Sequence, residues 1–142
     1  MHFTELLYAN GEPIGPGDWV RVFVPRLGVW HHGIVRRVSH LTGALFVVEI
    51  AHNMKPKGVT ATDLIEFGDG QPVLLHRRPL PFQVPEILAR VDANVGRPYH
   101  LFAQNCEHFA SFAFMGKAES TSVKTAGALT MAGIIVFGLL ND

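Results

Sequence analysis

The chain contains a single cysteine, Cys106, at a position where a thiol could act as a nucleophile. The apolar residues after it recur at i+3, i+4 and i+7, which places them on one face of a predicted helix with Cys106: Phe109, Ala110 and Ala113. A thiol in the first turn of a helix lies near unpaired backbone N–H groups and the positive end of the helix dipole. Both favour the thiolate, which is the form that attacks a carbonyl carbon in acyl transfer.

The two residues before the cysteine could support that reaction. Asn105 is a preferred residue type at the N-cap of a helix, and Gln104 can add a side-chain amide donor. With the backbone N–H of Cys106 they could form an oxyanion hole for the charge that develops on the carbonyl oxygen. The competing interpretation is that Cys106 is a small buried hydrophobic residue, as most free cysteines are.

Two short strings carry a resemblance to a known family. The sequence NCEHF at residues 105–109 resembles the box of the lecithin:retinol acyltransferase-like group, which includes the phospholipase A/acyltransferases. The sequence HHGI at residues 31–34 resembles its H-box. In that family a papain-like fold is circularly permuted, so that the histidine strand precedes the cysteine helix, as it does here. The resemblance covers Asp18 to Gly116 and implies an α+β fold in which a small antiparallel sheet packs on helices, with the cysteine at a helix N-terminus.

The resemblance also implies a reaction. Cys106 attacks the ester carbonyl of a phospholipid or another acyl ester, His31 removes the thiol proton, and a thioester then passes its acyl group to water, an amine or another lipid. Neighbouring residues of a strand point to opposite faces, so only one histidine of the pair can meet the thiol. The spacing to Gly33 selects His31, and His32 is expected to be structural.

The family uses a third polar residue, on the strand after the H-box, to orient the base. A group on the far imidazole nitrogen fixes the tautomer that can accept the thiol proton. The candidates are His52, Asn53 and Glu49, and His52 is favoured because it lies at the exit of an apolar strand. His108 is about 200° round the helix from the cysteine, so we expect it to be structural and to hold a neighbouring segment by a hydrogen bond.

Two other classes of function remain open. The string YHLFAQNC at residues 99–106 also resembles the permuted papain-like deubiquitinases and deSUMOylases, although Glu107 favours the lipid group. A non-enzymatic interaction protein is the third alternative, since some viral proteins resembling this group keep both boxes without a demonstrated need for catalysis.

Composition bounds the partners and cofactors. Twelve Lys and Arg balance twelve Asp and Glu, so no basic stripe indicates a nucleic-acid partner. One cysteine cannot form an internal disulfide, which suits a reducing compartment. The histidines do not reproduce a zinc-ligand spacing, and no glycine-rich phosphate loop is present, so we expect neither a metal nor another cofactor. Nothing in the sequence indicates the oligomeric state.

Alternating and helical patterns outline the elements that must position these residues. Strands are predicted at 18–24, 30–38, 44–50 and 72–76, with a turn at 39–43, a loop at 55–58 and a linker at 78–85. A short capped helix is predicted at 62–67 and a longer one at 85–91. These elements make residues 1–118 one catalytic domain, and 119–142 a separate apolar C-terminal segment.

Residues 125–140 carry no charge and raise the question of a membrane. Sixteen helical residues span about 24 Å, which is short of the roughly 30 Å of a hydrocarbon core. We expect this segment to contact a membrane as an anchor or docking helix, and the alternatives are a helix packed on the sheet or an apolar surface that a partner covers. The N-terminus lacks the build of a secretory signal, so a location in the cytoplasm or on the cytoplasmic face of a membrane is expected.

Overall fold

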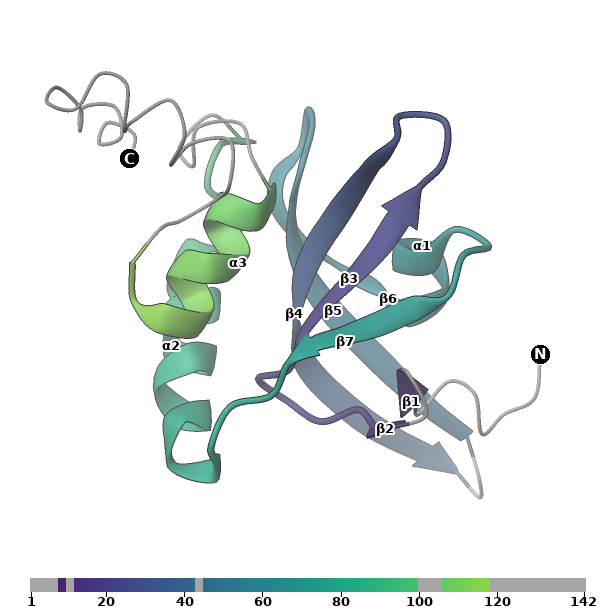
Figure 1. Ribbon diagram of the computed structural model, residues 1–142. Coiled ribbons are helices and arrows are strands. Elements are labelled where there is room, and N and C mark those ends of the chain that lie inside the picture. Colours follow the sequence, from purple (N-terminus) through teal and green to yellow (C-terminus); the bar gives the residue numbers. More distant parts are fainter. Residues whose placement is uncertain (1–7, 10–11, 43–44, 100–105, 118–142) are drawn as a thin grey trace, which may run out of the picture.

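The computed structural model describes residues 8–9, 12–42, 45–99 and 106–117 (Figure 1). Within these ranges an antiparallel sheet of five strands, in the order β6-β5-β4-β3-β7, forms the centre of the fold, and a two-stranded ribbon precedes it. The elements are β1 (Tyr8–Ala9), β2 (Glu12–Pro13), β3 (Trp19–Val24), β4 (Val29–Thr42), β5 (Leu45–Met54), β6 (Gly58–Asp63), α1 (Leu64–Gly68), β7 (Val73–Arg77), the 3₁₀ turn η2 (Pro81–Gln83), α2 (Val84–Asn94) and α3 (Cys106–Met115). The predicted α+β class is confirmed.

Helices cover both faces of the sheet. Neighbouring residues of a strand point to opposite sides, so each strand contributes to the core on both faces. Ile34 faces α2 and α3, which lie side by side on one face, and packs with Ile87 and Phe109 (Figure 1). The next residue, Val35, belongs to a second cluster on the other face, where it packs with Phe67 of α1. Residues 32–35 of the central strand β4 are thus buried from both sides, next to His31.

The predicted boundaries are confirmed in part. The strands at 18–24 and 72–76 and the helices at 62–67 and 85–91 are present as β3, β7, α1 and α2. The turn predicted at 39–43 is wrong, because β4 continues to Thr42 and Ser39 pairs with Val47 of β5. The strand β6 was missed altogether, since its sequence GVTATD lacks the apolar alternation that identifies a strand. It pairs along β5 from Met54 to Glu49 and so extends that strand past His52.

Two glycines, Gly33 and Gly58, allow close packing near the H-box and near the segment that follows α2. A Cβ on Gly33 would lie 2.6 Å from Ile50 Cγ2 and 3.0 Å from a ring carbon of Phe67, so the H-box needs a residue without a side chain there. Gly58 has a φ of +88° and packs against the backbone of residues 97–99. This contact holds the segment after α2 against β6.

The described residues contain no helix long and apolar enough to cross a membrane. The apolar run at 125–140 lies outside the described residues, so its predicted membrane contact is not tested.

Candidate active site

Cys106 is the first residue of α3, as the sequence predicts, and its sulfur contacts the backbone of β4. The His32 N–H donates to Cys106 Sγ at 3.4 Å, and the thiol donates to the carbonyl oxygen of Trp30 at 3.7 Å. These two backbone groups flank His31. The first pair between β4 and β5 joins Ile34 to Ala51, so the sulfur lies beside a stretch of β4 that precedes this pairing.

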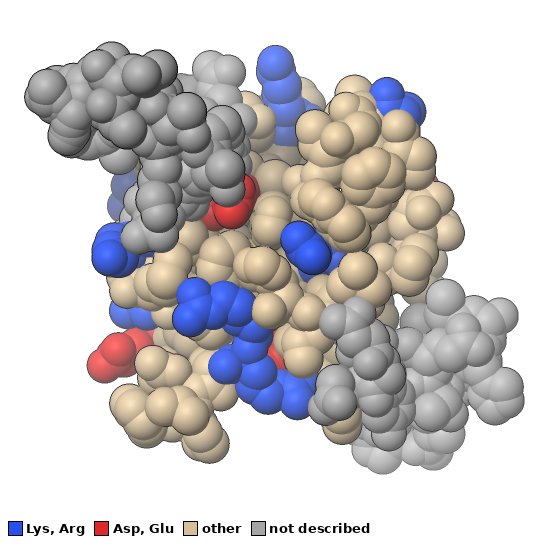
Figure 2. All heavy atoms as spheres, viewed as in Figure 1, with Lys and Arg blue, Asp and Glu red and all other residues tan. Residues whose placement is uncertain are grey.

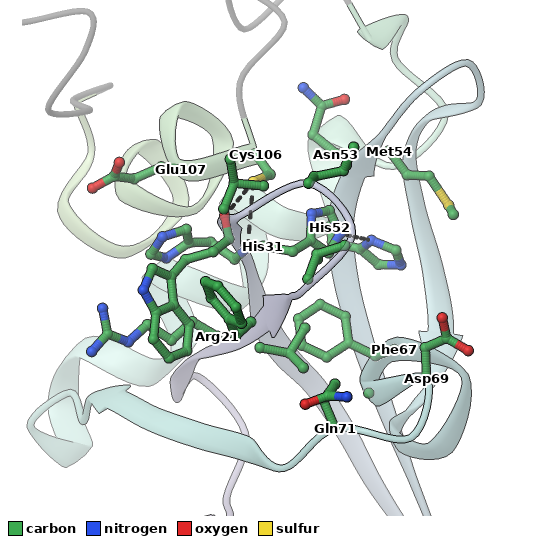
Figure 3. Close-up of a pocket in the computed structure, with 18 of the residues that line it drawn as sticks. Arg21, His31, His52, Asn53, Met54, Phe67, Asp69, Gln71, Cys106 and Glu107 are labelled. Atoms are coloured by element: carbon green, nitrogen blue, oxygen red, sulfur yellow. Dashed lines mark hydrogen bonds between the residues drawn. The ribbon is translucent and has the colours of Figure 1, made fainter.

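His31 and His52 point toward one another from neighbouring strands (Figure 3). His31 Nε2 lies 2.7 Å from His52 Nδ1, and the ring planes are nearly perpendicular, at 87°. The other nitrogen of His52, Nε2, lies 3.0 Å from the hydroxyl oxygen of Thr62 on β6. The ring of Phe67 packs against both imidazoles, at centroid distances of 5.4 Å from His31 and 5.2 Å from His52. A chain of hydrogen-bonding groups therefore runs from β6 through β5 to β4.

The direction of this chain determines whether His31 can act as a base. If Thr62 donated to His52, then His52 would donate to His31 Nε2, and the remaining proton of His31 would occupy Nδ1. In the opposite direction His31 Nε2–H donates to His52 Nδ1, and His52 Nε2–H donates to the Thr62 oxygen. Only this second arrangement leaves His31 Nδ1 with a free lone pair that can accept a thiol proton.

Burial keeps both imidazoles neutral. It lowers the pKa of His31 from 6.5 to about 4. It lowers the pKa of His52 to about 3, with smaller effects from the charges of His31 and Lys57. At neutral pH both rings are therefore uncharged, which is the state that the chain of hydrogen bonds requires.

The thiol differs from the sequence-based expectation. Burial raises the pKa of Cys106, and this outweighs the hydrogen bond from the His32 N–H, which lowers it. The nearby carboxylate of Glu107 raises the pKa further, while the N–H groups of Cys106 and Glu107 lower it as the helix terminus predicts. The resting site thus holds a neutral thiol rather than a thiolate.

The remaining histidines and candidate orienting residues have other contacts. The His32 imidazole is buried on the opposite face and its Nδ1 accepts from Trp19 Nε1 at 2.9 Å, so its side chain has the expected structural role. The carboxylate of Glu49 pairs with Arg36 at 3.4 Å, and the amide of Asn53 donates to the backbone oxygen of Tyr99 at 3.0 Å. Of the three candidates to orient His31, only His52 forms a hydrogen bond with it in the described part of the chain.

The sequence also predicts roles for residues next to Cys106, namely a structural His108 and oxyanion donors at Gln104 and Asn105. His108 is buried, with 1% of its surface exposed, and the hydrogen bond expected of it stays a prediction. Gln104 and Asn105, the expected oxyanion donors, lie outside the described residues.

Tyr99 is a residue of the site that the sequence reasoning missed. It is half-buried and lines the same groove as Cys106. Burial raises the pKa of its hydroxyl, and so does the charge of Cys106 when the thiol ionises, which places the phenol near the sulfur. Its position at the start of the string YHLFAQNC was the available signal.

The thiol and both imidazoles line one open groove of about 1180 Å³. Phe23 and Trp30 contribute aromatic surface to the same groove, and Tyr99 a phenol. This volume is at or above the upper end of the range for small-molecule pockets. No group of three His, Cys, Asp or Glu residues in the described ranges is arranged to hold a metal ion.

Comparison with family profiles matches residues 12–119 to the family described as Lecithin retinol acyltransferase. The chain belongs to the lecithin retinol acyltransferase family. The antiparallel sheet and the cysteine at the start of α3 agree with the fold of this family. Membership in the lecithin retinol acyltransferase family implies cysteine acyltransferase or phospholipase chemistry, and both the cysteine and the histidine for it are present. No curated protein and no solved structure matches the chain.

Proposed function

We propose that the protein is a thiol-dependent phospholipid acyl hydrolase or acyltransferase that works through a thioester on Cys106. The observation that carries the proposal is the location of the sulfur. It rests between the two backbone groups that flank His31, while the far nitrogen of His31 is bonded to His52. A nucleophile beside a base that is itself oriented by a third group is the arrangement that acyl transfer requires.

Acylation begins from the neutral thiol. In the proposed first step the thiol leaves the Trp30 carbonyl oxygen, and His31 Nδ1 takes its proton as sulfur bonds to the ester carbonyl carbon. Negative charge develops on the carbonyl oxygen, where the backbone N–H of Cys106 is a donor candidate. The tetrahedral intermediate then expels the alkoxide of the lysophospholipid, which leaves as an alcohol with the proton from His31.

Deacylation repeats these steps with a second nucleophile. Water, an amine or a lipid hydroxyl gives its proton to His31 Nδ1 as it attacks the thioester carbonyl carbon. The carbon–sulfur bond breaks, and the thiolate takes the proton back from His31. The acyl group leaves as a free acid, an amide or a new ester, and the neutral thiol is regenerated.

His52 and Thr62 act as positioning residues in this proposal. When His31 is protonated, its Nε2–H still needs an acceptor, and a neutral His52 with its proton on Nε2 provides one at Nδ1. The Thr62 oxygen holds that proton on Nε2 by accepting it in a hydrogen bond. The low pKa of His52, about 3, keeps it neutral throughout the cycle.

Mass spectrometry of the intact protein after incubation with phosphatidylcholine tests the proposal. We expect an added mass equal to one acyl group, which hydroxylamine at neutral pH removes, as it removes thioesters. The adduct should be absent in Cys106→Ala and form at least 100-fold more slowly in His31→Ala. An adduct that persists in Cys106→Ala contradicts the proposal. Reaction with a ubiquitin-based thiol probe but not with lipid would instead support the peptidase class.

The apolar residues 125–140 form the second part of this proposal, as the segment that contacts the membrane. Flotation with phosphatidylcholine vesicles compares the full chain with one that lacks the last eighteen residues. We expect the shortened chain to float less, and unchanged flotation would reject the segment as the anchor.

A further inference from the structure

The β3–β4 hairpin ends in an apolar tip, residues 23–30, that projects from the sheet (Figure 1). Large hydrophobic side chains are exposed to solvent here: Leu27 is 61% exposed, Val29 49%, and Phe23 and Trp30 37% each. Phe23 and Trp30 are cross-strand partners with ring centroids 5.2 Å apart. Single exposed hydrophobic residues are ordinary, but a contiguous group on one hairpin marks an interaction surface.

The hairpin is also cationic. No Asp or Glu occurs between Asp18 and Glu49, whereas this stretch contains four arginines. Arg36 and Arg37 pair with acidic residues away from the tip. Arg21 lies over the ring of Trp30 at 4.2 Å, and neither it nor Arg26 forms an ion pair with a carboxylate of the described residues. Figure 2 shows this end of the molecule as mainly uncharged surface with Lys or Arg atoms at its margin.

The tip is continuous with the groove that holds the thiol, because Phe23 and Trp30 line both. The ester bonds of a phospholipid lie at the boundary between headgroups and acyl chains, which is the depth that amphipathic elements reach. Trp and Arg are residues that favour this interface, and the phosphates there attract cations. A hairpin that inserts at the interface would therefore bring the mouth of the groove to the ester.

We propose that the hairpin tip, residues 23–30, docks on an anionic phospholipid bilayer. The proposal rests on the proposed lipid substrate and adds the surface through which the domain itself reaches the bilayer. Leu27 and Val29 supply the inserted apolar surface, and Arg21 and Arg26 meet the lipid phosphates.

The full chain offers a local probe of this contact. It has two tryptophans, and Trp19 is buried at 3% exposure, so Trp30 is the one that lipid can reach. We expect vesicles of phosphatidylcholine and phosphatidylserine with brominated acyl chains to quench Trp30 fluorescence. Trp30→Phe should remove the quenchable signal. Leu27→Glu should weaken the vesicle affinity measured by quenching at least tenfold, and Arg26→Gln about threefold at low salt. Leu80→Glu, at a leucine of similar exposure directly before η2, is the matched control and should bind as wild type.

Each contrary result has a distinct meaning. Vesicles that bind the chain without quenching Trp30 would place the contact on another segment and overturn the proposal. Equal quenching by vesicles of pure phosphatidylcholine would contradict the proposal that the bilayer must be anionic. A dimer that Leu27→Glu dissociates, without any quenching, would assign the tip to a second copy of the chain. Quenching requires no chemistry, so intact docking without a thioester rejects the proposed function alone, and a thioester without docking rejects only the hairpin.

Discussion

His31 Nε2 lies 2.7 Å from His52 Nδ1, and this contact leaves Nδ1 as the nitrogen of His31 that remains for another partner. In the direction that leaves His31 Nδ1 without a proton, the acceptor for His31 is a neutral ring rather than a carboxylate. It can fix the tautomer and the orientation of the base, but it offers only a dipole to the imidazolium that forms during the reaction. Burial lowers the pKa of His31 to about 4, and a neutral partner has no charge with which to raise it again.

Replacement of His52 by Ala removes the acceptor for His31 Nε2–H. We expect the rate of thioester formation to fall about 100-fold with little change in KM, because the loss affects proton transfer rather than binding. Single-turnover acylation followed by mass spectrometry measures this rate. Wild-type acylation by a folded His52→Ala variant, with its fold checked by circular dichroism, would remove His52 from the site.

Thr62 affects the same step through one further hydrogen bond. Thr62→Val keeps the shape of the side chain but removes the oxygen that holds the proton on His52 Nε2, so we expect acylation to slow about 5- to 30-fold. Thr62→Ser should restore the rate. Thr60→Val, two residues earlier on the same strand, is the control for a general effect on β6. Equal rates in the two valine variants, or no recovery with serine, would show that the hydroxyl has no part in positioning.

The pH dependence of alkylation distinguishes a neutral thiol from a preformed thiolate. Because burial raises the pKa of Cys106, iodoacetamide should react slowly at pH 7, and the rate should rise about tenfold for each pH unit toward alkaline pH. Cys106 is the sole cysteine, so total incorporation reports this one group. In contrast, lipid acylation should reach its plateau once His31 loses its proton near pH 4. Alkylation that is already maximal at pH 6 would indicate a thiolate and contradict the assignment.

Acid should destabilise the fold through its buried histidines. The pKa values of His31, His32 and His52 fall from 6.5 to about 4, 3 and 3, chiefly through burial. Below pH 6.5 the unfolded chain binds protons that the folded chain does not, so stability is present above that pH and is lost as the pH falls toward 4. The limiting slope is about 1.4 kcal/mol per pH unit for each histidine. Urea unfolding midpoints at pH 7.5, 6 and 5 measure this loss, and midpoints that do not change would disprove it.

Gly33 is required by packing, which a single methyl group can test. Gly33→Ala places a Cβ 2.6 Å from Ile50 Cγ2 and 3.0 Å from the backbone oxygen of Ala51, so we expect a loss of about 1–3 kcal/mol in the free energy of unfolding. Gly15→Ala is the matched control, because no neighbouring atom lies within 4 Å of its Cβ position. Equal unfolding midpoints for the two variants would contradict this reading of the H-box glycine.

The parts of the site that lie on strongly patterned elements could be predicted from the sequence. The helix periodicity after Cys106 gave the start of α3, and the alternation around His31 gave a strand whose two histidines face opposite sides. The edge strand β6 could not be found in this way, because its residues are polar and its pairing partner is set by the fold. The sequence therefore did not predict that Thr62 contacts His52. It placed His52 at the end of a strand, whereas the residue lies within β5.

The protonation state of the thiol was beyond the sequence for a different reason. The helix position correctly predicts backbone N–H groups that favour the thiolate. The opposing effect comes from the burial of the sulfur between β4 and α3, and burial depends on tertiary packing that the local sequence does not encode. Tyr99 was overlooked for the same reason, since Gly58 and Asn53 bring it to the groove through contacts distant in sequence.

The two backbone groups that hold the sulfur also give the reaction cycle a reporter. Once an acyl chain is attached to Cys106, the sulfur has no proton for the Trp30 oxygen and is a poorer acceptor for the His32 amide. The amide hydrogen of His32 should then exchange with deuterium faster in the acylated protein than in the free one. An NMR signal on the main chain of β4 would thus follow turnover without any label on the lipid.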